Sequence, residues 1–205
     1  MLQSATVHPA TLALLKKIMQ SPALQQFNLV GGTALALQIG HRISIDLDLF
    51  TEEDYDDVLV LQSLAPFGEL DVLVNNPPFL QLKLDNIKVD FLKFPYPLIQ
   101  DFIEVDQVRL VTVENIAMMK LLAIARRGSK KDFVDLFFIL KQYSLGELVK
   151  LFEQKLPHID MFHILKSLTY FEDAELDADP KMILKASWSE MKNNIIKKVN
   201  AFLAE

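Results

Sequence analysis

Apolar and polar residues alternate along several short stretches in the first half of the chain. Between residues 43 and 49 the apolar side chains occupy the odd positions, and Ser44, Asp46 and Asp48 occupy the even ones. A period of two is typical of a strand with one buried face. Apolar runs bounded by turn residues predict further strands at 27–30, 71–74, 79–84, 87–94 and 108–111. We expect Asp85-Asn86 to join two of these as a hairpin, and Pro95-Tyr96-Pro97 to form a bend or loop.

In the rest of the chain the apolar residues recur at intervals of three and four, which is the spacing of a helix with one buried face. It predicts helices at 9–20, 34–39 and 54–64, and then, after residue 112, at 114–127, 130–142, 145–156, 160–170 and 187–203. The sequence therefore predicts an α/β (α+β) fold in two parts. Residues 1–111 hold the strands, and residues 112–205 form a helical C-terminal domain. Because no Gly/Ser-rich linker separates the parts, we expect them to pack tightly.

Composition narrows the class of protein. The 205 residues are 51% hydrophobic and 23% charged, with no cysteine, so a disulfide framework and thiolate chemistry are excluded. The first nine residues lack the features of a signal peptide, and no apolar stretch reaches transmembrane length. These features predict a cytoplasmic protein that does not enter membranes. The net charge of −6 argues against tight, non-specific binding of nucleic acid over the whole surface.

Two glycines and two aspartates carry the candidate chemistry. Gly31-Gly32-Thr33 lies between an apolar strand and a short helix, where backbone N–H groups and a hydroxyl are available to phosphates. Asp46 and Asp48 lie on one strand face, although Asp is depleted in strands. Two carboxylates on one face could hold Mg²⁺, which prefers oxygen ligands and substrate phosphates. The alternative for the aspartates is a solvated strand face.

The string Gly-Gly-Thr-Ala-Leu-Ala-Leu, followed by Gly-His-Arg-x-Ser-x-Asp-Leu-Asp-Leu-Phe, resembles the AbiEii/AbiGii toxin family of the nucleotidyltransferase superfamily. The resemblance implies a mixed sheet flanked by helices, with residues 1–111 as the catalytic domain. It implies Mg²⁺ (or Mn²⁺) and a nucleoside triphosphate (NTP) as substrate. Its nucleotide-binding positions include Gly31, Gly32, Thr33, Arg42 and Ser44. Thr33 departs from the superfamily pattern, in which Ser is commoner, but it keeps the hydroxyl.

Asp90 is a lone acid in the predicted strand 87–94. The superfamily often has a third carboxylate on a strand beside the Asp-x-Asp strand, and the resemblance assigns Asp90 to that role. Asp46, Asp48 and Asp90 would then be both the metal ligands and catalytic residues. The alternative is a surface acid paired with Lys88.

Lys120 lies in a predicted helix that is apolar on nearly all sides, so its ammonium group needs an anion. The family has a lysine in this helix and aspartates in the next, which Lys120, Asp132 and Asp135 match. The resemblance makes Lys120 a catalytic and nucleotide-binding residue and places one of the two aspartates near it or near the nucleotide. The alternative is an internal salt bridge that holds two helices together.

Four basic residues, Arg126, Arg127, Lys130 and Lys131, bracket a predicted helix–helix turn. They could receive phosphates of an acceptor RNA, or they could be a solvated turn. The resemblance implies transfer of a nucleoside monophosphate to an acceptor hydroxyl, such as a tRNA end. It also implies a toxin-like role in a toxin–antitoxin or phage-defence system, with a cognate antitoxin. Two other readings are transfer to a small molecule or protein, and a nucleotide-binding module with little turnover.

Overall fold

The computed structural model describes residues 1–93, 98 and 101–204. The predicted bend at Pro95-Tyr96-Pro97 lies outside these residues. The chain divides into two compact units, Met1–Thr112 and Val113–Glu205, which are described separately below. No helix among the described residues has the length and apolar character needed to cross a bilayer.

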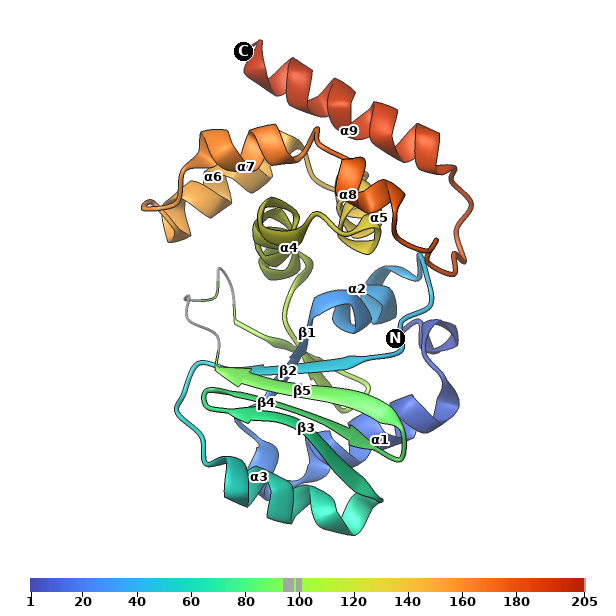
Figure 1. Cartoon of the computed structure of the whole chain (residues 1–205), viewed down its shortest axis with the longest axis vertical. Helices are drawn as coiled ribbons and strands as arrows, with labels where there is room; N and C mark the ends of the chain where they lie inside the picture. The colour runs from blue at the N-terminus through green and yellow to red at the C-terminus, as the bar shows by residue number, and fades with distance from the viewer. Residues whose placement is uncertain (94–97, 99–100, 205) are drawn as a thin grey trace. The chain divides into compact units, whose positions relative to one another are not determined.

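A mixed sheet is the centre of the first unit (Figure 1), which confirms the expected fold class. Among the described residues it has seven strands, in the order β3-β4-β5-β2-β1-β7-β6. β2 runs parallel to β5 and antiparallel to β1, and β1 runs parallel to β7. The strands are β1 (Asn28–Val30), β2 (Leu47–Thr51), β3 (Leu70–Asn76), β4 (Phe79–Leu84), β5 (Ile87–Lys93), β6 (Ile103–Val105) and β7 (Val108–Leu110).

Helices lie on both faces of this sheet. In the view of Figure 1, α2 (Gly31–Ile39) lies above the sheet, and α1 (Pro9–Gln20) and α3 (Asp57–Leu64) lie below it. Short 3-10 turns occur at Ser4–Thr6, Pro22–Leu24 and Ala65–Phe67. Leu47 and Leu49 of β2 and Val89 and Phe91 of β5 are fully buried, and the ring of Phe91 packs edge-on against Phe27 with centroids 4.9 Å apart. One face of these two strands is therefore core, and the other carries Asp48 and Asp90 beside the half-buried Phe50 and Leu92.

One strand prediction in this unit was wrong, and one strand was not predicted. Residues 43–46 alternate like a strand, but β2 begins only at Leu47, and Ile45 is 67% exposed. Strand β6 was not predicted. The turn that joins it to β7 is Asp106-Gln107, with φ of 51° and 66°. The predicted hairpin at Asp85-Asn86 is confirmed, with positive φ at both turn residues.

The second unit is helical among its described residues. α4 packs against α5, α6 and α7, and α9 packs against α5 and α6. Ser144 and Glu147 form the capping box that begins α6. A short helix, α8, lies between the predicted helices at 160–170 and 187–203, where no helix was predicted. The helices are α4 (Val113–Arg127), α5 (Lys130–Ile139), α6 (Leu145–Lys155), α7 (Met161–Ser167), α8 (Glu172–Glu175) and α9 (Trp188–Leu203).

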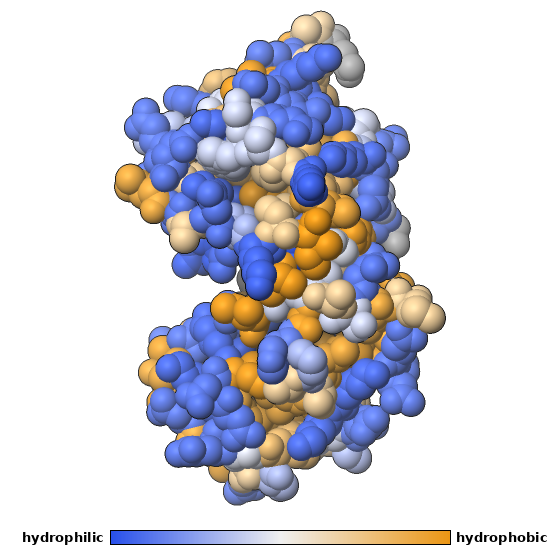
Figure 2. Space-filling view, turned by 90° about the vertical axis from the view of Figure 1, so that its right-hand side faces the viewer, coloured by the Kyte–Doolittle hydropathy of each residue, from blue (hydrophilic) through white to orange (hydrophobic). Residues whose placement is uncertain are grey.

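Hydrophilic residues cover much of the molecular face drawn in Figure 2, with apolar residues gathered between them. Some of the exposed apolar side chains belong to the edge strand β3. Val72, Leu73 and Val74 are 44%, 43% and 39% exposed. The pairing of β3 with β4 shifts register between Val72 and Val74. Such an irregularity bends an edge strand and makes it a poorer template for a further strand.

Candidate active site

The end of β1 and the start of α2 form one wall of the site. Gly31 follows Val30 directly and has φ of +70°, which favours glycine. A Cβ atom on Gly31 would lie 2.5 Å from Oδ2 of Asp48, so the carboxylate rests against the glycine backbone. The side chain of Val30 caps none of the amides in the first turn of α2. These N–H groups have no hydrogen-bond partner inside the helix. They lie at the N-terminus of α2, the helix end at which anions are stabilised.

Thr33 fastens the segment that leads into β2. Its hydroxyl is buried, donates to the carbonyl oxygen of Asp46 and lies 2.8 Å from the Ser44 hydroxyl. Thr33 and Ser44 therefore hold residues 44–46 against α2. The expected contact of Thr33 and Ser44 with nucleotide stays a prediction, and the structure adds this positioning role for Asp46.

Arg42 supplies a positive charge at the same helix end. Its side chain is buried, its Nη1 donates to the carbonyl of Ile43 at 3.0 Å, and its Nη2 lies against Gly32 where a Cβ would be. Gly32 therefore has no room for a side chain unless Arg42 moves. A buried guanidinium beside uncapped amides strengthens the preference of this end of α2 for an anion.

Two of the three predicted carboxylates lie side by side. Asp48 on β2 and Asp90 on β5 are direct partners in a parallel pair. Adjacent strands lie about 4.8 Å apart, and partners in a parallel pair point to the same face. Asp46 precedes β2 and is not part of the strand. Among the described residues, no three His, Cys, Asp or Glu side chains are grouped to ligate one ion. That Asp46 joins Asp48 and Asp90 in binding one metal ion therefore stays a prediction.

The contacts of Asp90 test whether these residues suit a divalent cation. Oδ2 accepts from Nε2 of Gln81 at 3.2 Å and lies 3.3 Å from Nζ of Lys88. Oδ1 is buried and has no hydrogen-bond partner in the part of the chain that the structure describes. A buried, unsatisfied carboxylate oxygen is costly, and so are two neighbouring negative charges. A hard divalent cation would relieve both costs, so the residues fit Mg²⁺ or Mn²⁺.

Sequence reasoning missed Gln81 and treated Lys88 only as the alternative partner of Asp90. A signal was available, because the hairpin at 85–86 pairs Leu84 with Ile87 and hence Gln81 with Asp90. Asn28 was also missed. It lies on β1 beside Phe50, and its Oδ1 is buried with no hydrogen-bond partner among the described residues.

Lys120 lies in the second unit, where it is 4% exposed. Its Nζ is 2.9 Å from Oδ1 of Asp132 and 2.6 Å from Oδ2 of Asp135, and both carboxylates are fully buried. Asp132 also accepts from Arg127 Nε at 2.8 Å and from Ser129 Oγ at 2.7 Å. This is the internal salt bridge between helices that the sequence left open. A role of Lys120, Asp132 or Asp135 toward nucleotide stays a prediction.

The electrostatics of this cluster favour the charged forms. Burial by itself would lower the pKa of Lys120, but the charges of Asp135 and Asp132 outweigh it and raise that pKa. Burial would likewise raise the pKa of Asp132, but the charge of Lys120, hydrogen bonds and the charge of Arg127 lower it to about 2. The ion pair therefore persists through the neutral pH range.

The four basic residues at the α4–α5 turn do not form one open cluster. Lys130 is buried, and its Nζ donates to the carbonyl of Asp177 at 2.7 Å and to Asp179 at 3.1 Å. Arg127, Arg126 and Lys131 are exposed, but Arg127 also pairs with Asp132.

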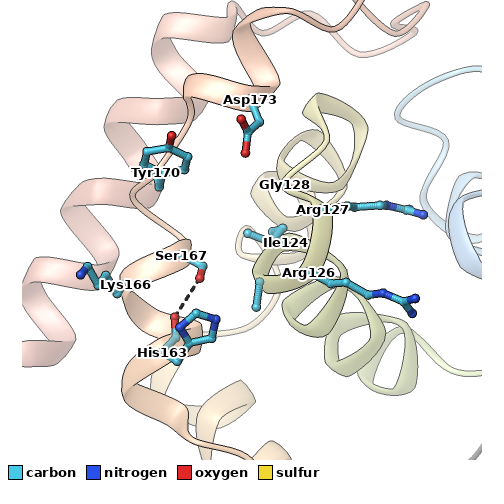
Figure 3. Close-up of a pocket in the computed structure, with 10 residues that line it drawn as sticks. Ile124, Arg126, Arg127, Gly128, His163, Lys166, Ser167, Tyr170 and Asp173 are labelled. Atoms are coloured by element: carbon cyan, nitrogen blue, oxygen red, sulfur yellow. Dashed lines mark hydrogen bonds between the residues drawn. The ribbon is translucent and has the colours of Figure 1, made fainter.

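A pocket of about 320 Å³ lies beside this turn and is bordered by both arginines. Figure 3 shows Arg126 and Arg127 extending away from His163 and Tyr170, which line its other side. The guanidinium groups therefore do not gather inside it.

Comparisons with known proteins agree with this geometry. The model of the family described as "Nucleotidyl transferase AbiEii toxin, Type IV TA system" matches residues 13–67 and 69–204. The uncharacterized protein aq_aa25 of Aquifex aeolicus (strain VF5) is 35% identical over 195 residues, which are 92% of this chain and 94% of that protein.

Two solved structures share the fold. MenT4, a nucleotidyltransferase toxin of Mycobacterium tuberculosis H37Rv, has a TM-score of 0.59 at 17% identity and covers 97% of this chain and 86% of its own. A putative nucleotidyltransferase from H. pylori has a TM-score of 0.55 at 20% identity, with 94% of each chain covered.

Proposed function

The chain belongs to the nucleotidyl transferase AbiEii toxin family, and from this membership and its site we propose a metal-dependent reaction. A nucleoside monophosphate passes from an NTP to an acceptor hydroxyl, and pyrophosphate is released. The observation that carries the proposal is the pair Asp48 and Asp90, set in register beside the start of α2, with Oδ1 of Asp90 buried and unsatisfied among the described residues.

Each part of the site has a role in this reaction. The first-turn amides of α2 and the guanidinium of Arg42 bind the triphosphate. Asp48 and Asp90, joined by Asp46, would hold Mg²⁺ or Mn²⁺, which would supply charge neutralisation at the phosphates. The acceptor oxygen attacks the α-phosphorus, the bond to the β-phosphate oxygen breaks, and the hydroxyl proton passes to a carboxylate of the set.

Substitution of the carboxylates tests the proposal. Asp48→Asn and Asp90→Asn should each lower transfer of an α-labelled NTP into acceptor by about 10²-fold or more, because preorganised charge at the phosphates is lost. Both residues lie on the polar sheet face, so the fold should survive. Asp71→Asn on the exposed edge strand is the matched control and should transfer normally. Full activity in both site variants would refute the assignment.

For the acceptor and the biological role, we propose a tRNA end and a toxin of a toxin–antitoxin pair. The family description supports the second part. Incubation with labelled NTP and cell extract, followed by separation of RNA, protein and small molecules, tests the first. Label in the protein or small-molecule fraction would favour the other acceptors. Growth arrest on expression, relieved by the product of a neighbouring gene and absent in Asp48→Asn, tests the second.

A further inference from the structure

The hairpin of β4 and β5 brings two further side chains to Asp90. Gln81 is the direct cross-strand partner of Asp90, and Lys88 lies two residues before it on the same face. Both approach the same oxygen, with Gln81 Nε2 at 3.2 Å and Lys88 Nζ at 3.3 Å from Oδ2. The other oxygen, Oδ1, is the buried atom without a hydrogen-bond partner among the described residues.

We propose that Gln81 is a positioning residue for the cation site and that Lys88 opposes the cation electrostatically. The inference rests on the proposed function, since it concerns the same carboxylate. A carboxylate turns about its Cβ–Cγ bond unless its oxygens are held. The amide of Gln81 holds Oδ2 and thereby leaves Oδ1 as the metal ligand. Outer partners of ligands act in this way in metal sites.

Lys88 holds the same oxygen but adds a full positive charge close to the cation. Its side chain is 38% exposed, so water and salt screen that charge in part. Gln81 contributes position without charge, whereas Lys88 contributes repulsion of the incoming ion as well. Loss of the two side chains should therefore change metal affinity in opposite directions, and a merely structural role would not do so.

Mn²⁺ alone is the probe, and the unbound ion is measured by electron paramagnetic resonance in solutions of the full-length protein without nucleotide. Gln81→Leu keeps the side-chain volume and should weaken binding by about tenfold, as is usual for lost outer partners. Lys88→Met should strengthen binding by about threefold to tenfold at about 0.1 M KCl. At about 1 M KCl the Debye length falls to roughly 3 Å, so only the Lys88 effect should shrink.

Lys83→Met is the matched control. Lys83 is the cross-strand partner of Lys88 on the same face, but among the described residues it forms no ion pair with Asp90, and its side chain is exposed. Removal of its charge should change Mn²⁺ affinity by less than about twofold in the presence of salt. Circular dichroism melting confirms that each variant is folded, and Gln81→Ala is the second variant if Gln81→Leu is not.

The outcomes separate this inference from the proposed function. If Asp90→Asn abolishes Mn²⁺ binding while the Gln81 variants bind as the wild type does, the positioning role is refuted and the metal site stands. If Lys88→Met weakens binding, Lys88 supports the site rather than opposing the cation. If Asp90→Asn binds Mn²⁺ like the wild type, or if the wild type binds none, the metal assignment itself fails.

Discussion

Replacement of Lys120 by Met should reduce the free energy of unfolding of the helical unit by about 3–5 kcal/mol, the range for a broken buried ion pair. Met keeps most of the side-chain volume, so the loss is electrostatic. Nζ lies 2.9 Å from Asp132 and 2.6 Å from Asp135, and both carboxylates are fully buried. After the substitution, two buried negative charges have lost the cation that they share.

Lys120 makes the closer of its two contacts with Asp135, and Asp132 also accepts from Arg127 Nε at 2.8 Å and Ser129 Oγ at 2.7 Å. The double variant Lys120→Met/Asp135→Leu should recover part of the stability, because it removes one of the two buried negative charges together with the cation that they share. A double-mutant cycle over these two positions measures the coupling.

The pH dependence follows from the pKa directions. Asp132 has its pKa lowered from 3.8 to about 2, so it contributes stability above pH 4 that is lost as the pH falls toward 2. That contribution is about 2 kcal/mol. The pKa of Lys120 is raised above 10.5, so its contribution is complete below that pH and is lost only in stronger alkali. In Lys120→Met the acid-side loss should shrink, because the pKa of Asp132 rises.

Urea unfolding followed by tryptophan fluorescence measures these effects. The chain has one tryptophan, Trp188, whose ring contacts Phe133 and Phe171 within the helical unit, so the signal reports on this unit. Lys150→Met, at an exposed position of α6, is the control and should change stability by less than about 0.5 kcal/mol. A stability of Lys120→Met within about 1 kcal/mol of wild type would refute the reasoning. If Lys120→Met kept its stability but lost NTP binding, a nucleotide-binding role of Lys120 would be favoured over the structural one.

Two further predictions concern the first-unit site and the acceptor. Gly31→Ala should abolish transfer, because its Cβ would lie 2.5 Å from Asp48 Oδ2 at φ of +70°. Gly40 also has a positive φ, but a Cβ there would contact only the flexible side chain of Gln3. Gly40→Ala should therefore be less stable than the wild type and still active, and equal activity of the two variants would contradict the role of Gly31. Joint replacement of Arg126 and Lys131 by Ala should reduce the slope of log affinity for tRNA against log salt by about two, and an unchanged slope would place the RNA elsewhere.

The alternation of residues 43–49 shows where sequence reasoning stops. The pattern reports which side chains are apolar, but a strand also needs a partner for its backbone. Residues 47–51 find partners in β1 and β5, whereas the preceding segment is held by Thr33 and by a single bridge between Ser44 and Val7. Ile45 is therefore exposed, and Asp46 lies outside the strand that it was expected to share with Asp48.

The pairing of Asp48 with Asp90 depends on information of two kinds. The antiparallel register of β4 and β5 follows from the two-residue turn between them, so Gln81 could have been placed opposite Asp90 by counting. The register of β2 and β5 is parallel, and such strands are joined by a long connection that leaves their relative shift open. The resemblance to a family supplied the role of Asp90, but only the structure sets it beside Asp48.

For Lys120 the sequence indicates that an anion must lie near the ammonium group, but it does not show which groups supply it. A lysine in an apolar helix requires an anion, and two acids three residues apart share one face of the next helix. Whether that face turns toward Lys120 depends on the turn between the helices. Gly128 has φ of +55°, and Ser129 precedes α5 and donates to Asp132. This turn fixes the phase of α5, which brings both carboxylates to Lys120. The same two acids, rotated by half a turn, would have left the ammonium group unpaired.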